Sequence, residues 1–111
     1  MTNENFDKSI MERFDKCISL LDIKQTEYSG EAPDRLQVFK TAAALQNINP
    51  KAALAGMLAK HIVSIYDMCF DKKTYTPEKW DEKINDAINY LLLLGAIVEE
   101  ENNEKHSNKS A

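Results

Sequence analysis

The sequence predicts an all-α protein whose helices form a four-helix bundle-like single domain. Apolar residues recur at helical spacing in four stretches of the chain, which is the pattern of amphipathic helices. Only three glycines and three prolines occur among 111 residues, too few for the many turns of an all-β fold. We expect a helical domain over residues 1–101 and a disordered tail over residues 102–111, where apolar residues are almost absent.

The composition argues against several classes of protein. The net charge is −4, so we expect no direct DNA binding and no attraction to anionic membranes. No apolar run reaches membrane-spanning length and the N-terminus is polar, so we expect no membrane segment, no export signal and a cytoplasmic location. Without an export signal, Cys17 and Cys69 are predicted to be reduced thiols in or near the core.

The first helix is predicted over residues 6–24, with an apolar stripe that we interpret as core. The stripe consists of Phe6, Ile10, Phe14, Cys17 and Leu21. Asn3 or Asn5 is a candidate cap for this helix. A glycine and a proline then interrupt the pattern, so residues 25–33 are predicted to form a loop.

The second and third helices are predicted over residues 34–46 and 50–70. Asn49 followed by Pro50 favours a helix start, because asparagine caps the free N–H groups and proline suits the first helical position. The first half of the third helix is rich in alanine, and such small residues let a neighbouring helix approach closely. His61 falls within the apolar arc of this helix, where we interpret it as a core residue rather than a ligand.

The fourth helix is predicted over residues 77–101, because Thr76 before Pro77 repeats the signal of a cap followed by proline. The middle of this helix is unusually apolar. Over residues 90–94 it is apolar nearly all round, which an exposed surface helix would not tolerate. Asp86 and Asn89 should therefore lie beside a second buried surface. That surface is either a cleft or a subunit interface.

The same apolar segment predicts a homo-oligomer, most simply a dimer. Tyr90, Leu93 and Leu94 lie away from the main apolar face, and soluble monomers rarely expose a contiguous apolar patch. A twofold contact would let the patch cover itself. The alternative is that the first helix covers this side within one chain.

Polar residues line one side of the third helix and one side of the fourth. They are Lys60, Ser64 and Asp67 on the third helix, and Glu82, Asp86 and Asn89 on the fourth. Carboxylates four residues apart share a helix face and can hold a hard cation such as Mg²⁺ together with substrate phosphates, and lysine can bind a phosphate. The alternative is that both rows are solvated faces. The sequence has no Gly-rich phosphate loop, no Cys/His metal spacing and no nucleophile elbow.

Three segments carry a resemblance to a known family: EYSGEAPDRLQVFKTAAALQNINP, AALAGMLAKHIVSIYDM and EKINDAINYLLLL. They resemble small phage and prophage proteins related to the all-α NTP pyrophosphohydrolase (MazG-like) superfamily, over about residues 27–94. Tyr28 with Gly30 matches a Tyr-Gly turn, and Lys60 matches a lysine on the helix that follows. The most specific match is to an acid-x-x-x-Asp-x-x-small-Tyr pattern, at Glu82, Asp86, Asn89 and Tyr90.

The resemblance implies an oligomeric four- or five-helix fold with a nucleotide site between helices and Mg²⁺ held by Glu-x-x-Glu and Glu-x-x-Asp motifs. With the polar rows, it makes Glu82 and Asp86 the candidate metal ligands. The candidate ligand-binding residues are Tyr28, Lys60, Ser64, Asp67, Asn89 and Tyr90. The third helix has no Glu-x-x-Glu, however, and the second motif is at best Asp86-x-x-Asn89. Because phosphoanhydride hydrolysis needs metal to neutralise developing charge, we expect a surviving fold with altered or lost catalysis.

Two functions are consistent with these observations. The first is a helical nucleotide-binding protein, pyrophosphohydrolase-like and either active or degenerate. The second is a non-enzymatic interaction protein of phage origin, which sequesters a nucleotide signal or inhibits a host protein in the host cytoplasm. The lysine and carboxylate rows favour the first, and the missing Glu-x-x-Glu motif favours the second.

Overall fold

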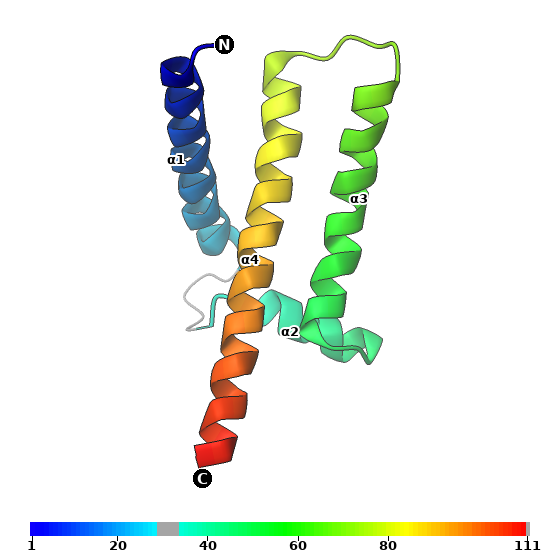
Figure 1. The fold of residues 1–111 in the computed structure, drawn as a ribbon. Coiled ribbons are helices and arrows are strands. Elements are labelled where there is room, and N and C mark those ends of the chain that lie inside the picture. Colours follow the sequence, from blue (N-terminus) through cyan, green and yellow to red (C-terminus); the bar gives the residue numbers. More distant parts are fainter. Residues whose placement is uncertain (29–33, 111) are drawn as a thin grey trace.

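A computed structural model shows a chain built of α-helices (Figure 1). It describes the backbone of residues 1–28 and 34–110, and the side chains of residues 1–24 and 34–106. The helices are α1 (Asn3–Tyr28), α2 (Gln37–Gln46), α3 (Pro50–Phe70) and α4 (Pro77–Ser110). No strand occurs in this described part of the chain, so the prediction of an all-α fold with four helices is confirmed.

The helices α3 and α4 form an antiparallel pair, which is the most extensive contact of the fold (Figure 1). The sequence predicted how both helices begin. The side chain of Asn49 accepts a hydrogen bond from the N–H of Ala52 at 2.8 Å, and Thr76 Oγ1 accepts one from the N–H of Lys79 at 3.1 Å. Each bond satisfies a backbone donor that the first turn of a helix leaves free.

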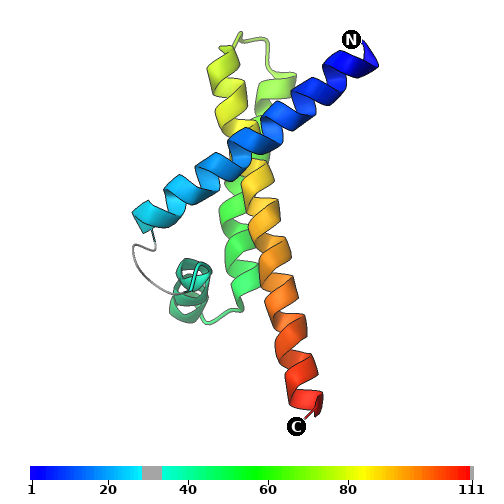
Figure 2. The ribbon, with the colours of Figure 1, turned by 90° about the vertical axis from the view of Figure 1, so that its left-hand side faces the viewer.

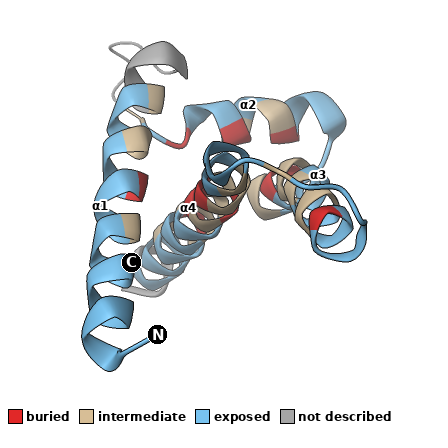
Figure 3. Ribbon diagram, turned by 90° about the horizontal axis from the view of Figure 1, so that it is seen from above, coloured by how far each residue is buried: buried red, intermediate tan, exposed pale blue. Residues whose placement is uncertain are grey.

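The helix α1 crosses α4 at a steep angle instead of running beside it (Figure 2). Seen from above, α1 and α3 lie on different sides of α4, and α2 runs along one side of this row (Figure 3). The cap of α1 is Thr2, whose Oγ1 accepts a hydrogen bond from the N–H of Asn5 at 3.1 Å, so neither predicted asparagine is the cap. The described chain therefore has the four helices of a bundle, but only α3 and α4 run side by side along their length.

The core lies where α2 meets the first half of α3 and the second half of α4. Its buried members are Leu36, Phe39, Leu54 and Ile97, and the half-buried side chains packed on them are Met57, Leu58, Tyr90, Leu93 and Leu94. The sequence assigned Tyr90, Leu93 and Leu94 to a surface that a second copy would cover. These side chains instead pack against the core of their own chain, so this patch alone does not call for a dimer.

The apolar stripe of α1 is largely exposed, although the sequence predicted that it forms core. Cys17 is buried, but Phe6, Ile10 and Phe14 are exposed. Ile10 lies seven residues before Cys17 and therefore on the same helix face. The N-terminal half of α1 projects past α4, so this face loses its partner after the crossing point (Figure 2).

The disordered tail expected over residues 102–111 stays a prediction, and residue 111 lies outside the described residues. The helix α4 continues to Ser110, and residues 102–106 are exposed on it. Glu101 forms an ion pair with Lys51 at 3.0 Å, which ties this region of α4 to the start of α3. A continuing helix satisfies its own backbone hydrogen bonds, so the segment stays helical without packing on the core.

The helix α3 is long and apolar enough to cross a membrane by length and composition alone. The sequence predicts no apolar run of membrane-spanning length, and Lys60, His61 and Asp67 lie within this helix. Little of its apolar stretch is buried within the chain. A large apolar surface on α3 is therefore left open.

Candidate functional site

Ion pairs and an aromatic contact join three helices near the middle of α4. Lys24 of α1 donates a hydrogen bond from Nζ to Oδ1 of Asp86 at 3.0 Å. His61 of α3 places Nδ1 3.9 Å from the other oxygen of Asp86. The ring of His61 also lies against that of Tyr90, with the ring centroids 5.0 Å apart. Asp86 thus lies between a cation from one helix and an imidazole from another.

Asn89 lies one turn beyond Asp86 on the same face of α4, and its side chain is an exception to a general rule. Buried polar atoms nearly always have hydrogen-bond partners, because leaving one unpaired costs about 1–3 kcal/mol. Asn89 is only 3 % exposed, yet neither Oδ1 nor Nδ2 has a partner. Nδ1 of His61 is likewise buried and unpaired. Three buried polar side-chain atoms on α3 and α4 therefore lack a hydrogen-bond partner among the described residues.

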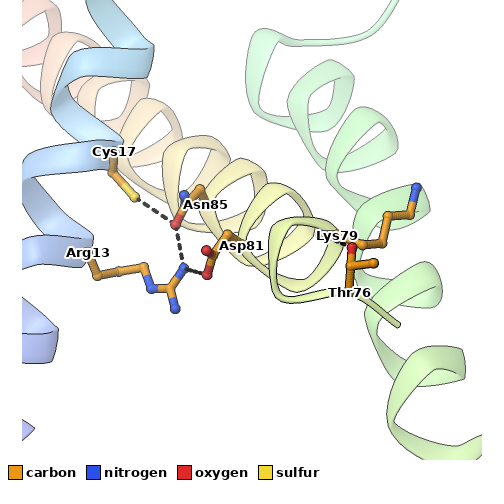
Figure 4. A network of polar contacts seen from close by, with 6 residues as sticks. All are labelled: Arg13, Cys17, Thr76, Lys79, Asp81 and Asn85. Carbon is orange, nitrogen blue, oxygen red and sulfur yellow. Dashed lines mark hydrogen bonds and ion pairs between the residues drawn. The ribbon is translucent and has the colours of Figure 1, made fainter. Parts of the chain in front are cut away.

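In a neighbouring polar network, by contrast, the buried polar side chains are hydrogen-bonded to one another (Figure 4). Arg13 donates from Nη1 to Asp81 at 2.8 Å and to Oδ1 of Asn85 at 3.0 Å, and the Cys17 thiol donates to the same Asn85 oxygen at 3.6 Å. Burial raises the pKa of the Cys17 thiol, against the opposing effect of the Arg13 charge. Asn85 is as deeply buried as Asn89 but is bonded, so we assign this network to holding α1 on α4.

A groove of about 630 Å³ lies between the end of α1, the start of α2 and the second half of α4, and no residue of the polar cluster lines it. Its lining residues are Leu21, Asp34, Arg35, Leu36, Leu92, Leu93, Ala96, Glu99, Glu100 and Asn103. Half of these residues are apolar and form its floor, half are polar or charged, and the volume is typical of small-molecule sites. Leu93 lies four residues after Asn89, so the floor begins one helical turn from the unpaired amide.

Charged residues at the edge of the groove form their own ion-pair network. Lys40 Nζ lies 2.6 Å from Oδ2 of Asp34 and 2.5 Å from Oε1 of Glu100. The hydrogen bonds to Asp34 and then Glu100 raise the pKa of Lys40 above its usual range. The bond from Lys40, and then one from the N–H of Leu36, lower the pKa of Asp34. This network fixes the start of α2 to α4.

The structure brings together some of the sequence-predicted site residues and separates others. Asp86, Asn89 and Tyr90 lie in or beside the polar cluster, and Ser64 is half-buried on α3. Three others are exposed and form no ion pair within the described part of the chain: Lys60, Asp67 and Glu82. The side chain of Tyr28 lies outside the described residues.

The predicted Mg²⁺ site at Glu82 and Asp86 stays a prediction. No group of three or more His, Cys, Asp or Glu side chains suited to a metal ion occurs among the described residues. Asp86 is paired with Lys24, whereas Glu82 is exposed one turn away. A Mg²⁺ ion at these two carboxylates would therefore need water and substrate phosphates as its further ligands.

The sequence analysis overlooked two members of the cluster. Lys24 was read only as the last residue of the first helix, and His61 as a core residue. His61 is indeed half-buried, and its side chain faces Asp86 and Tyr90. Lys24 lies seven residues after Cys17, so helical spacing did place it on the packed face of α1.

Comparison of the chain with protein families, with curated proteins and with solved structures finds no match. The fold and the site geometry alone define the chain as a small all-helical domain with a polar cluster and a groove. Any finer assignment depends on the residues of the cluster.

Proposed function

We propose that this chain is a nucleotide-binding protein of MazG-like type that binds its ligand in the groove beside Asn89. The observation that carries the proposal is the buried Asn89 side chain, whose amide donor and acceptor are both unpaired. An amide in this state can pair with the edge of a nucleobase, as asparagine does with the donor and acceptor of adenine. The ligand would then supply the hydrogen bonds that the protein lacks.

The surroundings of Asn89 suit the remaining parts of a nucleotide. The apolar floor of Leu21 and Leu93 offers contact area for a base. Arg35 lines the groove and can bind a phosphate with two parallel hydrogen bonds. The resemblance to MazG-like phage proteins in the segments around Lys60 and Asp86 supports the same class of ligand.

Binding without hydrolysis is favoured over catalysis. Phosphoanhydride hydrolysis of the family type relies on metal held by carboxylates, and the described residues contain no group of three metal ligands. A degenerate pyrophosphohydrolase fold that sequesters a nucleotide or nucleotide-derived signal would need only the groove and the amide. Phage origin and action in a host cytoplasm belong to this same proposal.

A thermal-stabilisation experiment tests the proposal. A panel of nucleotides, with and without Mg²⁺, should contain a compound that raises the melting temperature, since a ligand at 100 times its Kd adds about 2.7 kcal/mol to the free energy of unfolding. We expect the shift to be independent of Mg²⁺ and to disappear in Asn89→Leu. Glu82→Gln, which changes an exposed carboxylate on the same helix, is the matched control and should keep the shift.

Each other outcome has a defined meaning. A Mg²⁺-dependent shift with release of pyrophosphate would replace sequestration by hydrolysis. A shift that survives Asn89→Leu would move the site away from the amide. The absence of any shift across the panel would overturn nucleotide binding and favour inhibition of a host protein.

A further inference from the structure

The outer face of α3 carries an apolar surface that no described part of the chain covers. Its members are Ala52, Ala55, Gly56, Ala59, Ile62, Val63, Tyr66 and Phe70, and all are exposed. They follow helical spacing on the side opposite Leu54 and His61, which face the rest of the fold. A helix that is apolar on both its inner and outer faces is normally buried on both. The small residues expected to meet a close neighbour have none here, and the space around Gly56 is open.

The surface area of the whole chain points the same way. The chain exposes 8305 Å², whereas a folded monomer of 12.6 kDa exposes about 6,200 Å². Its radius of gyration is 16.9 Å, against about 13 Å expected for this length. The excess of about 2,100 Å² is more than the roughly 800 Å² per partner that a standard protein interface buries. The chain therefore has enough spare surface for a stable dimer.

We propose that the chain forms a homodimer in which the outer face of α3 packs antiparallel on the same face of a second copy. The reason for a second copy is that this face is complementary to itself. Its first half is small and its second half is large, so an antiparallel twofold pairing places large residues over small ones. A single register places Ala52 opposite Phe70, Gly56 opposite Tyr66, and Ala59 opposite Val63.

The twofold axis of this pairing lies on the outer face at the level of position 61, where Ala59 of each copy meets Val63 of the other, and the small first half of the face lets the two helices approach closely. An isologous contact uses the same patch on both copies and closes the assembly at two chains. The polar cluster lies on the other side of α3, between α3 and α4, so the dimer leaves the proposed nucleotide site open. The dimer and the nucleotide site can therefore fail independently.

A lipid bilayer is the other surface that could cover an apolar helix, but α3 suits it poorly. Insertion would bring Lys60, His61 and Asp67 to membrane depth, and ionisable residues there are costly. It would also detach α3 from α2 and α4, its two main contacts in the fold. The net charge of −4 adds no attraction to anionic lipid.

The oligomeric state provides the first test. Sedimentation equilibrium at micromolar concentration should give twice the 12.6 kDa chain mass. Tyr66→Glu should yield a folded monomer, because Tyr66 is 62 % exposed within the chain while the dimer would bury the new charge. Leu45→Glu is the matched control, since Leu45 of α2 is 84 % exposed and lies outside the face, and it should stay dimeric. Circular dichroism confirms that both variants remain helical.

Cross-linking tests the antiparallel register in a Cys69→Ser background, because Cys69 is exposed. Ala59→Cys lies near the axis and should be captured by a short bismaleimide. Phe70→Cys lies at the end of α3, where the antiparallel arrangement separates the two copies of this residue by about 27 Å along the helix axis. It should give no cross-linked dimer.

Three results would overturn the proposal. The first is a wild-type chain that remains monomeric at 100 µM in solution. Co-sedimentation of a monomeric chain with neutral phosphatidylcholine vesicles counts as the same result, because lipid would then cover the face. The second is a Tyr66→Glu protein that stays dimeric, because the interface would then lie elsewhere. The third is efficient cross-linking through Phe70→Cys, which would mean a parallel pairing.

Discussion

Lys24 and Asp86, 62 residues apart in the sequence, form an ion pair at 3.0 Å that joins the last turns of α1 to the middle of α4. The Asp86 side chain is only 16 % exposed, and its second oxygen lies 3.9 Å from His61. A carboxylate with so little access to water depends on its protein partners for compensation. Lys24 therefore stabilises the crossing of α1 over α4 as well as the candidate site.

Lys24→Met should lower the free energy of unfolding by about 1–3 kcal/mol, because it leaves the Asp86 carboxylate without its cation. Urea denaturation measures the change. The control is Lys8→Met, which removes an exposed i,i+4 pair with Glu12 at 3.9 Å and should cost less than about 0.5 kcal/mol. Equal costs in the two variants would mean that the Lys24–Asp86 pair is no stronger than a surface pair.

Local signals in the sequence predicted the elements of the fold well. Asn49 before Pro50 and Thr76 before Pro77 marked the starts of α3 and α4, because capping depends only on neighbouring residues. The path of α1 could not be predicted in this way. Its stripe identifies an apolar face but not what covers it, and in the structure α4 covers only the part near Cys17.

The candidate site was predicted in part for the same reason. Helical spacing placed Asp86 and Asn89 on one face of α4 and indicated a second buried surface. It could not show that Lys24 reaches Asp86, because that contact depends on the crossing angle of α1. Nor could it show that the amide of Asn89 lacks a partner while that of Asn85 has two.

Asn85 and Asn89 should respond oppositely to the same substitution. Asn85→Leu should lower the free energy of unfolding by about 1–3 kcal/mol, because Arg13 and Cys17 lose their shared acceptor. Asn89→Leu should leave stability unchanged or raise it in ligand-free protein, because it removes two unpaired buried atoms. Chemical denaturation of both variants is the measurement. A large loss in Asn89→Leu would show that its amide is bonded in solution.

The two thiols should differ in reactivity. Cys69 is exposed, whereas Cys17 is buried and has a raised pKa, which lowers the fraction of reactive thiolate at neutral pH. A chromogenic disulfide reagent should therefore modify one thiol per chain rapidly and the other slowly. Cys69→Ser should remove the fast phase, and urea should accelerate the slow one. Two fast phases in native protein would mean that α1 detaches readily from α4.

The network of Lys40 predicts a pH dependence of stability. The pKa of Asp34 is lowered from 3.8, so its contribution is present above pH 3.8 and lost as the pH falls through the lower folded value. The pKa of Lys40 is raised from 10.5, so its contribution is present below pH 10.5 and lost as the pH rises through the higher folded value. Stabilisation by the network should therefore be constant from about pH 5 to 10.

Lys40→Met should reduce the free energy of unfolding by about 1 kcal/mol within this range, since all three side chains are about one-third exposed and water screens them. The difference from wild type should shrink below about pH 4 as Asp34 becomes protonated. Lys51→Met, which loses a single ion pair with Glu101 instead of two pairs, should cost less. A difference that grows in acid would show that Lys40 acts by packing its stem and not by charge.

Asn47 ends α2 in the left-handed conformation, with φ 57° and ψ 45°, and is the only non-glycine residue with positive φ among those described. Its N–H donates to the carbonyl of Ala44 and that of Ile48 to the carbonyl of Ala43, so the turn satisfies carbonyls at the helix end.

Glycine adopts the left-handed conformation of Asn47 without a Cβ clash, whereas a β-branched residue strains it. Asn47→Gly should therefore keep or slightly raise the melting temperature, and Asn47→Val should lower the free energy of unfolding by about 1–2 kcal/mol. Because the Asn47 side chain is exposed, burial contributes little to either change. Equal stability of the glycine and valine variants would mean that the turn adopts another conformation in solution.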